Sequence, residues 1–557
     1  MRCLALCLLC ACGGARTAAP TAPGGAGFAA DADAFYWAEY DHSPQSAVVL
    51  GHHQYDGKLP DVSPSALDAW LAELNRSYDK LAAYRGLTGT ERLEREVVLR
   101  RIDGERFGIA RLRAPYLNPI SYLGALELVY YVARDYAPLA ARAEAVIAIA
   151  RGTRAYLRQA DRNLERRIAR PFIETALLQV DGSIEFLAKD VPQAFARLPD
   201  QARLRAALAE MSSALAEYGQ AISRREPTET FALGEKDFLD YLEATEGVRL
   251  DLQTLTRIAN ETLGRDGKAM VAAAAQVDPK ANPFAVLARL PRPPVDGVLA
   301  TAEKQSAEMR RFLIDKQIVT IPSDDPAEVH ETPPFMRWNS AFLDPSGQFE
   351  KKPLPSFYYI TPPDPSWPRE RQLASLDTEV DLLFTTIHEV WPGHFLHKLH
   401  MEKNPSRIMK SFCSYQMGEG WAHYAEEMMW EQGVGGGDPK VHIGQLSNAL
   451  LRDARFASAL GLHTAGMSIA ASAKLFHDKG FQGEETSRQQ AVRGTFDPLY
   501  LNYTLGKLII KKLRADYQKK LGPAYSLKGF HDALLSYGCA PLPLIREQML
   551  GDAKGLL

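Results

Sequence analysis

Residues 380–394 read Val-Asp-Leu-Leu-Phe-Thr-Thr-Ile-His-Glu-Val-Trp-Pro-Gly-His, an apolar helical stretch that ends in a pair of histidines. Glu389 directly follows the first histidine, His388, and the second, His394, comes six positions after the first. A further carboxylate, Glu419, lies 25 residues after His394, within Gly-Glu-Gly-Trp-Ala-His-Tyr-Ala-Glu. Two histidines, an adjacent glutamate and a third carboxylate on a later helical stretch are the residue types of a zinc hydrolase.

The spacing of the two histidines does not fit a straight helix. In the H-E-x-x-H pattern the histidines are four residues apart, so both face the metal. Six residues turn an ideal helix by about 600°, which would point His394 roughly 120° away from His388. Pro392 lacks the N–H that would bond back to residue 388, and Gly393 permits backbone angles that other residues avoid. We therefore predict a kink or bulge of the helix there, which returns His394 to the side of His388.

The three ligand candidates imply a role for two more carboxylates. Zinc takes about four ligands, and a catalytic site leaves one position for water, so His388, His394 and Glu419 would hold one zinc ion. Glu389 would be the general base that takes a proton from water and passes it to a leaving amine. Glu426 lies seven residues after Glu419, two turns along the same helical face, and is predicted to orient a ligand histidine.

An interpretation of these residues without a metal is also open. The chain has 13 histidines, so pairs arise by chance. His397 and His400 follow the motif closely, which is also the pattern of a histidine-rich surface helix. Residue types and spacing alone do not separate the two alternatives.

Amphipathic spacing predicts helices along most of the chain. Ser63-Pro64 is a typical helix start, and apolar residues from Leu67 to Leu81 follow it at helical spacing. Similar stretches cover residues 89–113, 121–168, 171–180, 200–222, 236–247 and 251–276. The chain is helical again from about residue 370, with a loop at 433–437 and a break at Asp497-Pro498 before a helix at about 499–519. The predicted fold class is mostly α.

Prolines cluster between about residues 278 and 370 and interrupt this helical pattern. The run Ser356-Phe357-Tyr358-Tyr359-Ile360 between prolines predicts a short strand, and the neighbouring prolines favour an edge strand. Tyr358 and Tyr359 are then candidates to pair with an extended substrate backbone, the alternative being hydrophobic packing.

Composition limits the class of protein. With 557 residues, 46% of them hydrophobic, the chain can bury a large core. The 65 Lys and Arg nearly balance the 68 Asp and Glu, so nucleic acid is not an expected partner. No apolar run reaches the roughly 18–20 residues that span a bilayer. Because no long flexible linker interrupts residues 31–557, we predict a single large domain there.

The first 30 residues have the composition of an export signal. Arg2 precedes a short apolar, cysteine-rich stretch, and a run rich in Ala, Gly, Pro and Thr follows. Leu9-Cys10-Ala11-Cys12 is similar to a bacterial lipobox with Cys12 as the lipidated residue, although Cys10 is unusual at that position. Cleavable secretion and a disordered start on a cytosolic protein are the alternatives. The expected location is the bacterial cell envelope, lipid-anchored, periplasmic or secreted, with membrane contact only through the lipid anchor.

The two cysteines of the body leave their state open. Cys413 and Cys539 lie 126 residues apart. In an oxidising compartment they would form one disulfide, and two buried thiols are the alternative.

Several blocks of the chain resemble a bacterial family, domain of unknown function 885, which is rich in predicted lipoproteins. Its H-E-x-x-P-G-H and E-G-W-A motifs are matched at 388–394 and 419–422. Further blocks match in order at 50–56, 118–122, 461–463, 503–506 and 530–532. The chain departs from the family at His397, His423 and Ala459-Leu460, where Gln, Leu and an Asp-Thr pair are usual. The family is similar in fold to gluzincin metallopeptidases of the neurolysin and angiotensin-converting-enzyme type, which implies a large α-helical zincin-like fold with a small β element before the metal-site helix.

The resemblance also implies roles for residues outside the motif. By analogy with gluzincins, His463 and Tyr503 are candidates to donate hydrogen bonds to the oxyanion of a tetrahedral intermediate, the alternatives being a core histidine and a packing tyrosine. Arg455 is a candidate to bind a substrate carboxylate, with an ordinary surface or structural ion pair as the alternative.

Three functions remain, two of them zinc hydrolases and the third from another class. The first is a zinc-dependent peptidase that hydrolyses short peptides outside the cytoplasm. The second is a zinc amidohydrolase acting on a non-peptide amide, which the same site would serve. The third is a catalytically inactive, lipid-anchored binding protein, against which the intact Glu389 argues.

Overall fold

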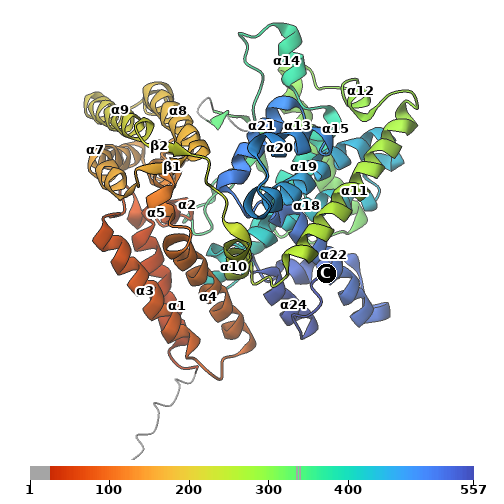
Figure 1. The fold of residues 1–557 in the computed structure, drawn as a ribbon, viewed down its shortest axis with the longest axis horizontal. Coiled ribbons are helices and arrows are strands. Elements are labelled where there is room, and N and C mark those ends of the chain that lie inside the picture. The colour runs from red at the N-terminus through yellow and green to blue at the C-terminus, as the bar shows by residue number, and fades with distance from the viewer. Residues whose placement is uncertain (1–24, 334–335, 338–339) are drawn as a thin grey trace, which may run out of the picture.

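Helices make up most of the computed structural model, which describes residues 25–333, 336–337 and 340–557 (Figure 1). The prediction of a mostly α fold is therefore confirmed. The predicted leader up to residue 24, with Cys12, lies outside the described residues. Helix α1 (Phe28–His42) begins within the last residues that were assigned to the leader.

The first half of the chain forms one side of the molecule, on the left in Figure 1. Its helices after α1 are α2 (Pro44–Val49), α3 (Pro64–Ala82), α4 (Gly89–Ala110), α5 (Ala114–Leu117), α6 (Val129–Ala133), α7 (Leu139–Asn163), α8 (Arg170–Ala194) and α9 (Ala202–Ser223). Strands β1 (Arg167–Ala169) and β2 (Glu226–Thr228) form a small parallel pair among them.

The second half forms the other side, and α10 (Gly234–Glu246) lies between the two (Figure 1). Its helices are α11 (Leu252–Val277), α12 (Pro283–Leu287), α13 (Val298–Lys316), α14 (Arg369–Ser375), α15 (Glu379–Glu389), α16 (His394–Lys403), α17 (Arg407–Ser411), α18 (Tyr415–Glu431), α19 (Pro439–Thr464), α20 (Ile469–Asp478), α21 (Glu484–Phe496), α22 (Asn502–Leu521), α23 (Leu527–Leu535) and α24 (Leu542–Leu550).

Local signals account for many of the helix boundaries. The Ser63 side chain accepts from the backbone N–H of Ala66, and Pro64 opens α3, as predicted. Thr88 and Glu91 form a capping box that starts α4. The helical stretch predicted over residues 121–168 is interrupted: short turns and α6 come first, and α7 begins only after Pro138. A residue before proline is disfavoured in helical conformation, so the chain breaks there.

The proline-rich region forms a three-stranded sheet in the order β3 (Ala327–Glu331), β5 (Ser356–Ile360), β4 (Ala341–Asp344). The strand predicted at Ser356–Ile360 is present, but its assignment as an edge strand is wrong, because β5 is central. The prolines flank β5 and none lies within it, so all its backbone N–H groups remain available to the two neighbouring strands.

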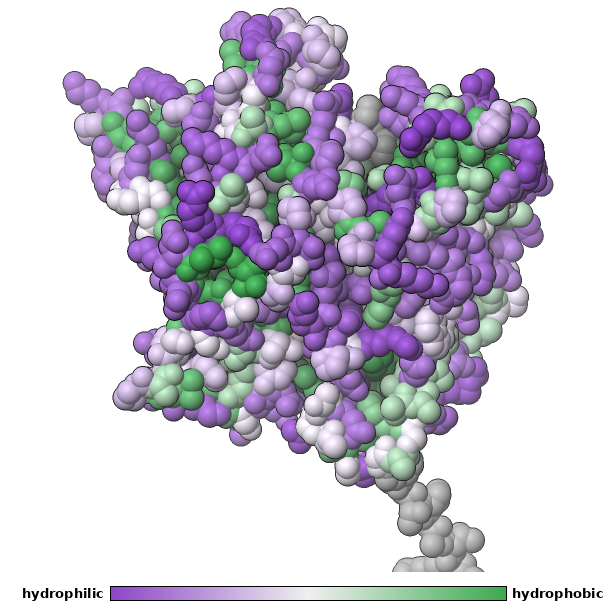
Figure 2. All heavy atoms as spheres, turned by 180° about the vertical axis from the view of Figure 1, so that it is seen from behind, coloured by the Kyte–Doolittle hydropathy of each residue, from purple (hydrophilic) through white to green (hydrophobic). Residues whose placement is uncertain are grey.

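One cluster of buried apolar side chains extends from Phe28 to Met549 and includes residues of both halves. A second, smaller cluster joins α11, α12 and α19. Figure 2 shows that the face seen from behind is mostly hydrophilic, with separate apolar patches. Among the described residues, no helix has the length and apolar character needed to cross a membrane.

Glu246, the last residue of α10, ties the two halves together next to α18. Its buried carboxylate accepts from the Ser414 hydroxyl and from the backbone N–H groups of Tyr415 and Gln416, at 3.2 and 3.4 Å. Ser414 in turn caps α18 by accepting from the N–H of Met417. The first turn of α18, the helix that carries Glu419, is thus fixed by α10, which lies between the two halves.

Candidate metal centre

The histidine motif spans two helices rather than one kinked helix. α15 ends at Glu389 and α16 begins at His394, and the peptide bond between Trp391 and Pro392 in the connector is cis. The N–H of Gly393 reaches back to the carbonyl of Ile387, at 3.0 Å. The prediction of a bend at Pro392 and Gly393 holds, but the helix stops and restarts there instead of continuing with a bulge.

Gly393 is the residue that allows this turn to close. A Cβ atom on Gly393 would lie 1.7 Å from the carbonyl oxygen of His388, so no side chain fits. The indole N–H of Trp421, from α18, donates to the carbonyl of Pro392 at 2.9 Å. The connector is therefore held by its own backbone and by the helix that carries Glu419.

This turn brings the three predicted ligands together. The rings of His388 and His394 lie 4.8 Å apart between centroids and are nearly perpendicular, at 88°. The Nε2 atom of each is 3.3 Å from Oε2 of Glu419. One potential ligand atom from each residue lies within 4.8 Å of the other two.

The donor atoms fit a zinc ion. Ligands about 2.0–2.2 Å from a tetrahedral ion stand about 3.3–3.5 Å from one another. Two of the three separations have the length expected for such a site. Oε2 of Glu419 is buried and has no hydrogen-bond partner among the described residues. A metal ion bound by all three residues would explain why this oxygen faces two imidazole nitrogens without accepting a hydrogen bond.

A close crossing of α18 and α22 sets the position of Glu419. A Cβ atom on Gly420 would lie 2.6 Å from the Cα atom of Gly506, and one on Gly506 would lie 2.3 Å from the carbonyl oxygen of Gln416. Only glycines permit this approach. Glu419 on α18 and Tyr503 on α22 both lie near His388: Glu419 is 3.3 Å from its Nε2 atom, and the ring of Tyr503 is 6.3 Å from its ring.

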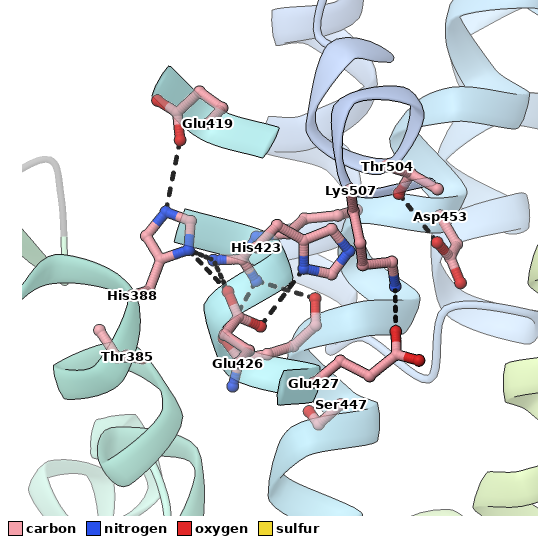
Figure 3. A network of polar contacts seen from close by, with 12 residues as sticks. Thr385, His388, Glu419, His423, Glu426, Glu427, Ser447, Asp453, Thr504 and Lys507 are labelled. Carbon is pink, nitrogen blue, oxygen red and sulfur yellow. Dashed lines mark hydrogen bonds and ion pairs between the residues drawn. The ribbon is translucent and has the colours of Figure 1, made fainter. Parts of the chain in front are cut away.

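Glu426 forms a hydrogen bond with His388, one of the two candidate ligand histidines. Its Oε1 atom lies 2.6 Å from Nδ1 of His388, and Figure 3 shows Glu419 and Glu426 on opposite sides of this ring. Donation from Nδ1–H to a carboxylate leaves the Nε2 lone pair free to face the other two ligands. Arg452 of α19 lies 3.2 Å from Glu426 and was not identified from the sequence.

The charges around the ligands are complementary. Burial raises the pKa of Glu426, but Arg452 and His423 outweigh it and hold the pKa below its ordinary value. Burial lowers the pKa of His394, but the Glu419 carboxylate outweighs it and raises that pKa to about 9. The pKa of Glu419 is held well below its ordinary value, since the two histidines overcome the effect of burial. The centre thus favours an ionised carboxylate beside cations.

Glu389 lies at the end of α15, and the small sheet holds it. Its Oε2 atom accepts from the backbone N–H of Leu343 in β4, at 2.9 Å. Glu389 is also close enough to raise the pKa of His394. Nothing in the sequence around Leu343 identified this partner, because a backbone donor leaves no residue-type signal.

Tyr503 lies beside the ligands, whereas His463 does not contact them. The Tyr503 hydroxyl accepts from Nη2 of Arg493 at 3.5 Å, and Arg455 lies over its ring at 4.6 Å. His463 is 1% exposed, bonds through Nε2 to the carbonyl of Gly494 and stacks on Phe238. The predicted oxyanion role of His463 is therefore corrected: it is a core histidine at the end of α19.

The burial of several other side chains also contradicts the roles considered for them from the sequence. Tyr358 is fully buried and bonds to Thr386, and Tyr359 is 5% exposed, so neither reaches an extended substrate from the central strand. His397 is buried against the carbonyl of Gly538, and His400 bonds to that of Thr320. The histidine-rich surface helix is thus excluded.

Cys413 and Cys539 form a disulfide, which settles the alternative left open by the sequence. Cys413 directly precedes Ser414, the residue that caps α18. The bond therefore ties the start of the Glu419 helix to the segment between α23 and α24.

The chain belongs to the family described as bacterial protein of unknown function, DUF885, whose profile matches residues 44–549. A solved structure of a candidate lipoprotein of unknown function from Shewanella oneidensis is similar with a TM-score of 0.78 and 24% identity, covering 94% of this chain and 99% of that one. A candidate lipoprotein from Colwellia psychrerythraea is similar with a TM-score of 0.77 and 16% identity, covering 94% and 98%. No curated protein matches. The family inferred from the motifs is confirmed.

Proposed function

We propose that this protein is a zinc-dependent peptidase that hydrolyses short peptides outside the cytoplasm. The observation that carries the proposal is the convergence of His388, His394 and Glu419, with Glu389 following the first ligand. The motifs match those of domain of unknown function 885, and the expected similarity of that family's fold to gluzincin metallopeptidases of the neurolysin and angiotensin-converting-enzyme type favours the same reaction.

His388, His394 and Glu419 would hold the ion, and Glu426 would keep His388 in the tautomer that binds it. When bound, zinc supplies a Lewis acid that polarises the scissile carbonyl and increases the acidity of water. The ligand set leaves room for water and substrate, because it uses three of about four positions.

Glu389 would move the proton. It takes a proton from the attacking water as the water oxygen bonds to the carbonyl carbon, and it delivers that proton to the nitrogen as the C–N bond breaks. The products are a carboxylate and an amine. The N–H of Leu343 keeps the Glu389 side chain in place for both transfers.

Tyr503 would stabilise the oxyanion by donating its hydroxyl proton. Burial raises the pKa of Tyr503, and the nearby Glu419 raises it further. The hydroxyl therefore remains a donor at neutral pH.

The same proposal places the protein at the bacterial cell envelope. The leader pattern with Cys12 and the description of both solved relatives as candidate lipoproteins support this location. The disulfide between Cys413 and Cys539 supports an oxidising compartment.

The test combines metal analysis with an activity assay. Purified protein should bind about one zinc ion and hydrolyse N-acetyl-penta-alanine. Glu389→Gln should keep the metal and lose roughly 10²–10⁴-fold in rate, the usual contribution of a general base. Glu379→Gln, which changes an exposed glutamate on the same helix, is the matched control and should keep full activity. Protein that takes up no zinc, or a fully active Glu389→Gln variant, contradicts the proposal.

A further inference from the structure

Arg455 is a buried cation without an anion. It lies in α19 with 7% of its surface exposed, and its one hydrogen bond runs from Nε to the neutral side chain of Gln490, at 2.9 Å. Its Nη1 and Nη2 atoms have no hydrogen-bond partner among the described residues, yet they are not sealed from solvent. Arg455 also forms no ion pair within the described chain. Buried charges are normally paired, so this guanidinium is left for a ligand.

The neighbouring arginines do have carboxylate partners. Arg452 pairs with Glu426 at 3.2 Å, and Arg493 pairs with Asp497 at 2.8 Å. All three guanidinium groups lie within 6 Å of the Tyr503 ring, and that of Arg455 is the nearest, at 4.6 Å. The local excess of positive charge is therefore carried by Arg455.

Tyr503 connects this excess charge to the candidate metal centre. Its ring lies 6.3 Å from that of His388 and 4.6 Å from Cζ of Arg455. An extended peptide advances about 3.3–3.6 Å per residue. An anionic group one to three residues from a scissile bond beside His388 would therefore reach past Tyr503 to Arg455. A guanidinium with two free nitrogens matches a carboxylate with two parallel hydrogen bonds.

We propose that Arg455 binds the C-terminal carboxylate of the substrate, so that the protein releases short fragments from the free C-terminal end of peptides. The inference rests on the proposed peptidase function and names its substrate class. Hydrolysis adds water across the C–N bond as described above. The fragment that leaves as the amine is then the one whose carboxylate Arg455 holds.

An acidic side chain near the scissile bond would present the same carboxylate, so the test must distinguish the two sources. Binding is measured by calorimetry in the zinc-loaded Glu389→Gln variant, which should bind peptide without cleaving it. The probes are N-acetyl-penta-alanine as the free acid, the same peptide as the C-terminal amide, and N-acetyl-Ala-Ala-Ala-Asp-Ala amide.

The free acid should bind about 10–100-fold more tightly than the amide, the usual range for a charge-assisted hydrogen-bonded pair. Adding Arg455→Gln should remove this preference and leave amide binding unchanged. Adding Arg205→Gln is the matched control and should keep it, because Arg205 is an exposed arginine that also donates to a glutamine, Gln201. Arg455→Lys keeps the charge but not the planar fork and should retain part of the preference.

Equal affinity for acid and amide, or an equal loss for both in Arg455→Gln, would overturn the carboxylate site. Tight binding of the aspartate-containing amide would assign Arg455 to an acidic side chain and overturn the C-terminal assignment. The result is separable from the proposed function. If the protein prefers the free acid through Arg455 but cleaves no peptide, the carboxylate site stands and the peptidase function is rejected. If it hydrolyses peptides without that preference, the peptidase function stands and the carboxylate site is rejected.

Discussion

Replacing Gly393 with alanine should disrupt the candidate metal centre through the backbone. The added Cβ atom would lie 1.7 Å from the carbonyl oxygen of His388 and 2.6 Å from that of Ile387, whereas ordinary contacts begin at 3.4 Å. The backbone of the connector must then move by about 1.7 Å. Ligands need to stay within about 0.5 Å of their productive positions, so His394 would leave the site. Overpacking of this kind also costs about 1–3 kcal/mol of folding free energy.

We expect Gly393→Ala to bind zinc at least about 100-fold more weakly, because losing a ligand costs more than the 10–100-fold of losing an orienting partner. Affinity is measured by competition with a chromophoric chelator, at a temperature where circular dichroism shows the variant folded. Gly264→Ala is the matched control: it lies within α11 with no atom within 4 Å of the added Cβ. That variant should bind zinc normally and gain about 0.5–1 kcal/mol of stability. Unchanged zinc affinity in Gly393→Ala would refute the argument that the connector positions His394.

Two further predictions concern residues behind the ligands. Glu426→Gln should weaken zinc binding by about 10–100-fold in the same competition assay, because a neutral amide accepts less strongly from His388 and leaves Arg452 unpaired; unchanged affinity would contradict this. Burial raises the pKa of Glu246 to about 7 from an ordinary value of 4.5. Between these values the unfolded carboxyl loses its proton while the folded one keeps it, so the stability of the wild type relative to Glu246→Gln should fall as pH rises, by up to about 3 kcal/mol. Urea unfolding across that range measures the difference, and a difference that does not vary with pH would count against it.

The convergence of His388, His394 and Glu419 could be predicted from the sequence because each residue stands in a local motif, recognisable by residue type and spacing. His388, Glu389 and His394 stand within seven residues, and Glu419 follows in a second motif. Pro392 and Gly393 predicted a bend but not its type, because a helix that bulges and a helix that stops have the same Pro-Gly signal. The strand at Ser356–Ile360 was found, but its place in the sheet depends on β3 and β4, which are remote in the sequence from its own pattern.

The residues that support the candidate ligands could not be predicted, because they carry no local sequence signal. Leu343 contributes a backbone N–H, which any residue other than proline supplies. Arg452 is one of many arginines, and only the packing of α19 against α15 and α18 brings it to Glu426. His463 was assigned to the site because an analogous position exists in other enzymes. Its burial against Phe238 could be seen only once α10 and α19 were placed.

The candidate ligands differ in how firmly the fold holds them. Glu419 and Glu426 are two turns apart on the same rigid helix, on opposite sides of the His388 ring, and α18 is fixed at its start by Glu246 and in its middle by the glycine crossing with α22. His394 instead depends on a four-residue connector. Its position is secured by the turn at Gly393 and by one hydrogen bond from Trp421. The candidate centre therefore combines a rigidly held carboxylate, Glu419, with a histidine oriented by Glu426 and a second histidine whose alignment depends on the connector. For this reason, adding one methyl group at Gly393 should reduce metal affinity more than replacing the Glu426 carboxylate.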